Sequence, residues 1–480
     1  MRKFIKKQIL DIFKILYEAH NSVRTYIEKK EKDNAVTVLG ECQNTAVQIG
    51  DIIDNSEGEG SPVIHLLEEY CEIVYQVSIG INEDITGTKA RKMLDKSLLK
   101  AENSVKNDIK VRLEIVFMPY KASMWDSLES VWRAAYEDPD CDAYVVPIPY
   151  YDRNPDHSFG KYHYEGNDYP EYVPIVYYEK YDLASRRPDV IYIHNPYDAS
   201  NYVTSVDPKY YSSELKKYTE CLVYIPYFVV AHERIQGIIL NNSACKYADK
   251  VFLQSKPLRD RYISIYEEMH IFDINELRNK FIAMGSPKFD LIVNSKKSDY
   301  YIPDEWQKII GDRKVVLYNT SLTTALNNTF LFLCKLRKTI AYFDDSSEYI
   351  LWWRPHPLLS STLSSMRPQY MKEYNGIVLM YRNTKKGIYD DSADLHRAIA
   401  FSDIYYGDLK SSVVVLYSAS GKPVVSSYIE DENEITSFDQ DMAEHYKDNS
   451  SLEILKRNEY YDGTSGIHIH KYVKTRNYGE

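Results

Sequence analysis

The chain has 480 residues, which is more than one ordinary hydrophobic core supports, so we expect several domains. Hydrophobic residues make up 44% of the sequence and charged residues 27%, values that exclude a wholly disordered chain and a fibrous repeat. The formal net charge of -11 at pH 7 gives no general attraction for nucleic acid, so we predict no nucleic-acid partner.

Cysteine usage and hydropathy place the protein in the cell interior. The six cysteines are scattered, without a C-x-x-C pair or histidines at zinc spacing, which is typical of reduced thiols. No apolar run reaches the roughly 20 residues that cross a bilayer, and the first residues lack the unbroken apolar segment of a signal peptide. We therefore expect a cytoplasmic protein, with peripheral contact at the inner face of the cell membrane as an open alternative.

Residues 1–108 carry the apolar period of helices and predict an all-α bundle. The first stretch, residues 1–20, sets apolar side chains at helical spacing beside lysines. Such a stretch is more often a bundle helix than a helix lying on an anionic membrane. We expect this domain to take part either in membrane contact or in self-association.

The period changes after residue 108. An apolar strand, a helix and a second strand within residues 110–150 predict the βαβ start of a parallel sheet. A tyrosine-rich segment, residues 150–188, follows and is too long to be a mere connection, so we expect it to be ordered and functional. Further strands are expected at "DVIYIHN", "CLVYIPYFVV", "KVFLQS" and "FIAMG".

A polar stretch near residue 299 precedes a second α/β pattern. Its strands are expected at "KVVLYNTS", "YILWW", "GIVLMY", "DIYYG" and "KPVVSS". We predict an α/β fold with three domains: a helical bundle (1–108), a Rossmann-like acceptor-side domain (109–298), and a Rossmann-like nucleotide-donor domain with a terminal helix (299–480). Two facing Rossmann-like domains with a cleft between them are similar to the GT-B architecture.

Two features at the ends of strands in the second pattern predict a ligand site. The run "YILWW" leads directly into Arg354-Pro-His356-Pro, and the prolines hold both side chains in a stiff segment at the carboxyl end of a strand. Ligands of open α/β sheets bind at that edge. The second feature is Ser411 and Ser412, which follow a strand and open an apolar helix, where a phosphate binds readily. The alternatives are a strand-ending turn and plain helix capping.

Five motifs in chain order resemble the CDP-glycerol glycerophosphotransferase family of teichoic acid synthesis. The resemblance covers roughly residues 249–480. The motifs are "VFLQSKPLRDRY", "GSPKFD", "RPHP", the strand–turn–Ser-Ser–helix segment that ends in "GKPVV", and "DGTSGIHIHKYVK". The resemblance implies transfer of glycerol phosphate, or a related polyol phosphate, from a CDP-activated donor to a membrane-linked acceptor of the cell envelope.

The resemblance also implies roles for particular residues. His356 would be catalytic, with Arg354 beside it at the donor diphosphate, and the serine pair would bind the donor. Transfer of this kind depends on positioning and charge neutralisation, which suits these groups.

The sequence departs from the family pattern at two places. The usual D-Y-S-S reads "DLKSS", so Asp408 comes one residue early and Lys410 replaces the tyrosine; we expect both to lie at the donor. The family's W-H-G is absent, and "AHERIQG" offers His232 and Glu233 as the catalytic base instead. On the acceptor side we expect His194 and Tyr227, with a structural role as the alternative for either histidine.

We expect no dedicated protein-bound metal and no cofactor, apart from a Mg²⁺ held weakly by the donor diphosphate. The expected partners are a CDP-polyol and a membrane-linked polymer. Two alternatives stay open: a nucleotide-sugar GT-B glycosyltransferase, and a catalytically degenerate scaffold that binds nucleotide or polymer.

Overall fold

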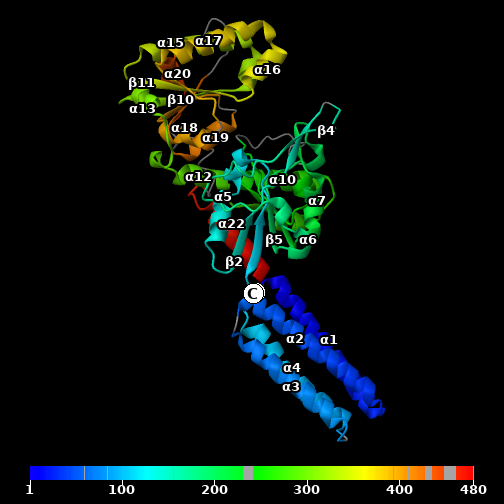
Figure 1. Cartoon of the computed structure of the whole chain (residues 1–480). Helices are drawn as coiled ribbons and strands as arrows, with labels where there is room; N and C mark the ends of the chain where they lie inside the picture. Colours follow the sequence, from blue (N-terminus) through cyan, green and yellow to red (C-terminus); the bar gives the residue numbers. More distant parts are fainter. Residues whose placement is uncertain are drawn as a thin grey trace. The chain divides into compact units, whose positions relative to one another are not determined.

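The computed structural model describes residues 1–58, 60–83, 85–154, 156–230, 242–392, 394–408, 411–427, 435–447 and 461–478. Figure 1 shows the elements coloured along the chain. The chain forms two compact units. The first comprises Met1–Ile115, Asp138–Ala143 and Leu183–Asp189, and the second comprises Val116–Glu137, Tyr144–Asp182 and Val190–Glu480.

The first unit is built on four long helices, and the sequence predicted this all-α character without the number of helices. Each helix buries an apolar stripe; in the first of them Ile9, Phe13 and Leu16 lie in a core shared by all four. The first helix packs on the second and the fourth, and the third does the same. The helices are α1 (Lys3–Glu28), α2 (Lys32–Glu57), α3 (Pro62–Gly80) and α4 (Gly87–Asn107).

One buried polar network crosses this bundle. The ring of His20 is fully buried on α1, and its Nδ1 lies 2.8 Å from Asp95 Oδ1. Its Nε2 lies 2.7 Å from the hydroxyl of Tyr70 on α3. Burial lowers the pKa of His20 below its ordinary value, although Asp95 acts in the opposite direction. Both ring nitrogens of His20 therefore have hydrogen-bond partners, which fixes the positions of α1, α3 and α4 along one another.

The first sheet has six strands in the order β2-β1-β5-β7-β8-β9. The strands from β5 to β9 pair in parallel, at the places where the sequence predicted strands. The strands are β1 (Leu113–Phe117), β2 (Cys141–Val145), β5 (Val190–Ile193), β7 (Cys221–Tyr224), β8 (Lys250–Leu253) and β9 (Phe281–Ala283). The accompanying helices are α5 (Glu129–Tyr136), α6 (Leu183–Arg186), α7 (Ser212–Leu215), α9 (Ser243–Tyr247), α10 (Lys256–Glu268), α11 (Ile274–Lys280) and α12 (Pro287–Asn294).

The tyrosine-rich segment contributes to a small sheet of its own. Strands β3 (Tyr150–Arg153), β4 (Phe159–His163) and β6 (Thr204–Val206) pair antiparallel in the order β4-β3-β6. Aromatic rings contact one another across it, for example Tyr151 and Tyr162 at 5.6 Å between ring centroids. The segment is thus ordered, as its aromatic content indicated.

The second sheet has the order β12-β11-β10-β13-β14-β15, with parallel pairs from β12 to β14. Its strands are β10 (Lys314–Thr320), β11 (Tyr349–Pro355), β12 (Ile388–Tyr389), β13 (Ile404–Gly407), β14 (Val424–Ser426) and β15 (Tyr446–Lys447). Its helices are α13 (Asp304–Ile310), α14 (Leu322–Asn327), α15 (Thr329–Asp345), α16 (Leu359–Met366), α17 (Met371–Thr384), α18 (Leu395–Phe401), α19 (Ser412–Ala419) and α20 (Phe438–His445). The terminal helix α22 (Ser465–Tyr478) packs instead on α5 and α12, beside the first sheet.

The strand expected at "GIVLMY" is wrong, because these residues belong to α17. Tyr374, Ile377 and Tyr381 are the buried residues of that helix, at spacings of three and four. A short apolar run fits either period, and here the helical one prevails.

The fold class is therefore α/β, with two successive, mostly parallel sheets that follow an all-α region in the chain, as predicted. The proposed limits at residues 108 and 298 stay a prediction. None of the described helices combines the length and the apolar character that a membrane crossing requires.

Candidate functional site

Three neighbouring strands of the second sheet end at the same edge. In β10, Asn319 pairs with Arg354 of β11 on one side and with Gly407 of β13 on the other. A Cβ atom on Gly407 would lie 2.5 Å from the carbonyl oxygen of Asn319, so only glycine allows this approach. The residues that follow each strand therefore meet at one edge, where open α/β sheets bind ligands.

His356 follows β11 at this edge and is held by its backbone. Its amide donates to the carbonyl oxygen of Thr320 at 3.0 Å. The amide of Leu358 donates to its ring Nδ1 at 3.1 Å, so the neutral ring carries its hydrogen on Nε2. Burial lowers the pKa of His356, which favours this neutral form. The ring is only half-buried, and Nε2 has no hydrogen-bond partner among the described residues, so its N–H is available as a donor.

The two tryptophans of β11 do not cover His356. Both are fully buried in different cores, one on each face of the sheet. The strand is thus covered on both faces, as its unbroken apolar run predicted. It continues through Pro355, one residue beyond Arg354, before His356 emerges.

Arg354 is buried, and its guanidinium binds the segment that follows β12. One guanidinium nitrogen donates to Asp390 Oδ2 at 2.6 Å, and the other donates to the carbonyl oxygen of Ser392 at 2.5 Å. Asp390 is itself buried and also accepts from the indole nitrogen of Trp352 at 3.1 Å. In this arrangement Arg354 positions the segment after β12, while its contact with a donor stays a prediction.

The start of α19 lies at the end of the neighbouring strand β13. Ser411 caps the helix, since its hydroxyl accepts from the amide of Val413 at 3.2 Å. The side-chain amide of Asn319 donates to the same hydroxyl at 3.2 Å, which ties the cap to β10. Ser412 is the first helical residue and is exposed. The positive end of the helix dipole thus faces the edge that carries His356.

The carboxylate of Asp408 binds protein hydroxyl groups at this edge of the second sheet. Its Oδ2 accepts from the hydroxyls of Ser321 and Thr324, each at 2.9 Å. Ser321 is also the N-cap of α14, so the carboxylate holds the start of that helix against the end of β13. Lys410, the other predicted residue of this turn, lies outside the described residues.

On the first sheet, His194 follows β5 and is fully buried. Its Nε2 accepts from the amide of Tyr120 at 3.2 Å, and its Nδ1 lies 3.0 Å from the hydroxyl of Ser127. That hydroxyl already donates to the carbonyl oxygen of Met124, so Nδ1 is the donor. Burial lowers the pKa of His194 to about 3. The ring is neutral at ordinary pH, and neither nitrogen is open to a substrate.

Tyr227, the other predicted acceptor-side residue, is partly buried, and its ring meets the ring of His194 edge to face at 6.1 Å. Burial raises the pKa of Tyr227. The predicted base pair, His232 and Glu233, lies outside the described residues. The roles of these four residues stay predictions.

A buried ionic group that the sequence did not reveal joins the first-sheet and second-sheet domains. Asp126 of the short helix η1 (Ala122–Ser127) binds Lys288 Nζ of α12 through both oxygens at 2.6 Å. Its Oδ2 also lies 2.8 Å from Nε2 of His396 on α18. Burial alone would raise the pKa of Asp126, but Lys288 and His396 together hold it well below its ordinary value. Lys288 belongs to "GSPKFD", whereas no local pattern marks Asp126 or His396.

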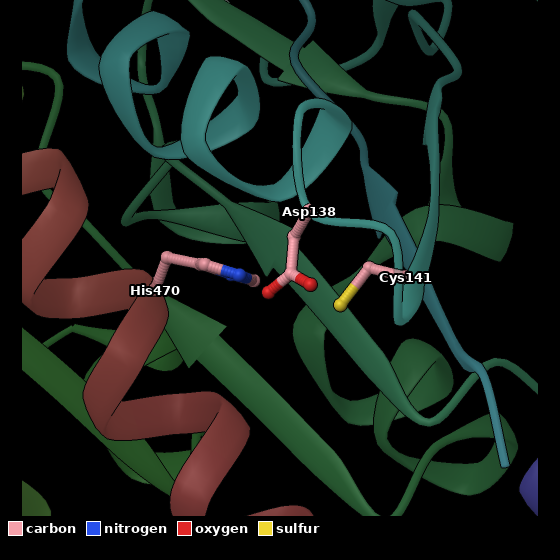
Figure 2. Close-up of side chains that lie close together, drawn as sticks. All are labelled: Asp138, Cys141 and His470. Atoms are coloured by element: carbon pink, nitrogen blue, oxygen red, sulfur yellow. The ribbon is translucent and has the colours of Figure 1, made fainter. Parts of the chain in front are cut away.

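Figure 2 shows three side chains with metal-binding atoms, namely Asp138, Cys141 and His470. Asp138 and Cys141 belong to the turn and strand β2 of the first compact unit, and His470 lies on α22 of the second. We assign no metal site to them, because the group is divided between the two units. The Mg²⁺ expected on a donor diphosphate stays a prediction.

Searches against known proteins found no matching family model and no matching curated protein. Similar solved structures include the UDP-GlcNAc 2-epimerase of Methanocaldococcus jannaschii, with 12% identity, 76% of this chain and 100% of that chain covered, and a TM-score of 0.43. The UDP-GlcNAc 2-epimerase of Neisseria meningitidis has 10% identity, coverages of 76% and 100%, and a TM-score of 0.42. An α,α-trehalose-phosphate synthase of Burkholderia vietnamiensis has 11% identity, coverages of 75% and 96%, and a TM-score of 0.38. At these values no function is carried over to this chain.

Proposed function

We propose that the protein is a transferase that moves glycerol phosphate, or a related polyol phosphate, from a CDP-activated donor to a membrane-linked acceptor. The observation that carries this proposal is the edge of the second sheet. There the open Nε2–H of His356 and the serine-capped start of α19 flank the end of β10. A hydrogen-bond donor and a helix N-terminus at the ends of the two strands on either side of β10 are suited to the two phosphates of a nucleotide diphosphate.

The transfer would form one bond and break another. The acceptor hydroxyl oxygen attacks the phosphorus that carries the polyol, and the bond from that phosphorus to the oxygen of CMP breaks. His356 would donate from Nε2 to a phosphate oxygen on which negative charge accumulates. The proton of the acceptor hydroxyl goes to a general base, for which we propose His232 with Glu233.

A second candidate is a nucleotide-binding scaffold without transferase activity. The specific observation in its favour is His194, whose two ring nitrogens are both occupied inside the first-sheet domain. Among the described residues this leaves that domain without an open histidine at the end of β5. A nucleotide-sugar glycosyltransferase would use the same edge, so the donor that binds distinguishes the two transferase proposals.

Thermal unfolding with a panel of ligands tests these proposals. The panel contains CDP-glycerol, CDP-ribitol, CMP, UDP-sugars and GDP-sugars, each added to the wild-type protein, to His356→Ala and to His65→Ala. The last variant is a matched control, because His65 is an exposed histidine of the helical bundle. A ligand at 100 times its Kd stabilises the folded state by about 2.7 kcal/mol.

We expect the cytidine nucleotides to raise the melting temperature of the wild type and of His65→Ala, and to leave His356→Ala unchanged. A response to UDP-sugars or GDP-sugars alone would replace the polyol donor with a nucleotide sugar. A protein that binds CDP-glycerol but releases no CMP with any lipid-linked acceptor would be the scaffold. No response to any nucleotide would refute a donor site at this edge.

A further inference from the structure

Charge is divided unevenly among the four helices of the bundle. The sequence has no lysine or arginine between Lys32 and Lys89, and α2 and α3 come from this interval. Lysines and arginines cluster instead on α1 and α4. The bundle therefore has an acidic side and a basic side.

The acidic side is a groove between α2 and α3 with a volume of about 660 Å³. Asp51 and Asp54 line it from α2, with Glu68 and Glu72 from α3. Val47 and Tyr75 also line it, and they are 53% and 56% exposed although they are apolar. Among the residues that the structure describes, no lysine or arginine lines the groove. We name it the acidic groove.

Gly50 lines the acidic groove from the middle of α2. A Cβ atom there would meet no other atom within 4 Å, so nothing in the described bundle requires glycine. Glycine within a helix costs about 1 kcal/mol relative to alanine. Its presence leaves room at this point for the side chains of an approaching helix.

The basic side is a groove between α1 and α4 with a volume of about 650 Å³. We name it the basic groove. Lys92 and Lys96 line it, beside Leu99, which is 48% exposed. Its two carboxylates, Asp95 and Glu102, already bind Arg91 and Lys106 within α4. Lys92 and Lys96 form no ion pair in the part of the chain that the structure describes.

The two grooves lie on opposite sides of the bundle. Helix α1 packs on α2 and α4, and α3 packs on the same two helices, so the helices form a ring in chain order. In such a ring the α2–α3 groove and the α4–α1 groove face away from each other. Two surfaces of opposite charge on opposite sides cannot pair within one copy, but each fits the other in a neighbouring copy.

We propose that the basic groove of one copy docks on the acidic groove of a second copy, through Lys92 and Lys96 against Asp51 and Asp54, with the exposed apolar side chains meeting between them. This contact is heterologous, so it extends from copy to copy instead of closing as a symmetric dimer. Charge complementarity favours the second copy over an anionic membrane, because a membrane on the basic groove would leave the acidic groove without a partner, whereas a second copy pairs with it. The proposal is independent of the transferase reaction.

Analytical ultracentrifugation of the full chain tests the proposal. At low ionic strength we expect the average mass to rise with protein concentration above the 56.1 kDa of one chain. In about 0.5 M salt the Debye length is well under 10 Å, so the charges are screened and the average mass should fall towards that of one chain. The variants are Asp51→Lys with Asp54→Lys, and Lys92→Glu with Lys96→Glu. Each should weaken association about tenfold or more.

Mixing the two variants is the decisive step. Each variant keeps one native groove, so neither should associate alone, whereas the mixture should associate again. Glu41→Lys is the control for a charge reversal outside the groove, because Glu41 is exposed on α2 and does not line the groove. Gly50→Leu should block the acidic groove without a change of charge, whereas Gly40→Leu, at another open glycine of α2, should not.

Several results would overturn the proposal. A wild-type chain that stays at 56.1 kDa at every concentration would refute it, as would oligomers that the two charge variants leave unchanged. A mixture that stays monomeric would also refute it. A monomer that sediments with vesicles of phosphatidylcholine and phosphatidylglycerol would instead assign the basic groove to a membrane. Far-UV circular dichroism confirms that each variant keeps its helices.

Discussion

The buried state of His194 predicts a specific dependence of stability on pH. In the folded chain its pKa lies at about 3, whereas an unfolded histidine titrates near 6.5. As the pH falls through 6.5, the unfolded chain therefore binds a proton that the folded chain does not bind. The contribution of the neutral ring is present above pH 6.5 and is lost progressively as the pH falls from there towards 3.

The size of the effect follows from the two pKa values. Between pH 8 and pH 5 the unfolded ring becomes almost fully protonated while the folded ring stays neutral. One pKa unit corresponds to about 1.4 kcal/mol, so this interval lowers the free energy of unfolding by about 2 kcal/mol. Replacement of His194 by asparagine removes the titrating group and should remove this part of the pH dependence.

Two measurements test the prediction. Hydrogen exchange of the β5 and β7 amides at pH 8 and pH 5 gives the local unfolding free energy, corrected for the intrinsic exchange rate. The control is His65→Asn, whose parent side chain is 74% exposed. NMR of the 12 histidine rings, with the His194 signal assigned by its loss in His194→Asn, shows its protonation directly. A His194 ring that titrates near pH 6.5 would refute the reasoning, and His194 would again be a candidate for the general base of the transfer reaction.

Three further predictions concern the second sheet and the bundle. Gly407→Ala should destabilise the second sheet by about 1–3 kcal/mol, because the new Cβ meets a backbone oxygen. Gly376→Ala, at an open position of α17, should instead stabilise the folded chain by about 0.5–1 kcal/mol. Urea unfolding measures both changes. Asp390→Asn leaves the buried guanidinium of Arg354 without its carboxylate and should lower the free energy of unfolding by about 3–5 kcal/mol. Asp391→Asn, at an exposed ion pair, should lower it by under about 1 kcal/mol in the same assay. The lowered pKa of His20 predicts that the bundle loses thermal stability as the pH falls below about 6.5, and His20→Gln should flatten that trend in melts followed by circular dichroism.

The sequence predicted the elements whose local pattern is strong. The apolar run of β11 and the helical period of residues 1–108 both depend on neighbours within a few positions, and both predictions are confirmed. The strand predicted at "GIVLMY" is wrong because the five apolar residues after Gly376 are compatible with either period, and the burial of Tyr374, Ile377 and Tyr381 follows the helical one.

The candidate site was predictable only where a strand end marked it. His356 and Ser411 follow apolar strands, so the edge could be located from sequence. Asp126 and His396 are separated by 270 positions, and only the packing of the first-sheet and second-sheet domains brings them together. Single-sequence patterns carry no signal for such a pair.

The ionic group at Asp126 has a consequence for motion between these two domains. Its carboxylate is shared between Lys288, which comes from the same domain, and His396, which comes from the other. If this contact between the two domains were lost, Lys288 would still pair with the carboxylate of Asp126. His396 therefore ties the two domains together, while the buried charge of Asp126 is compensated from within its own domain.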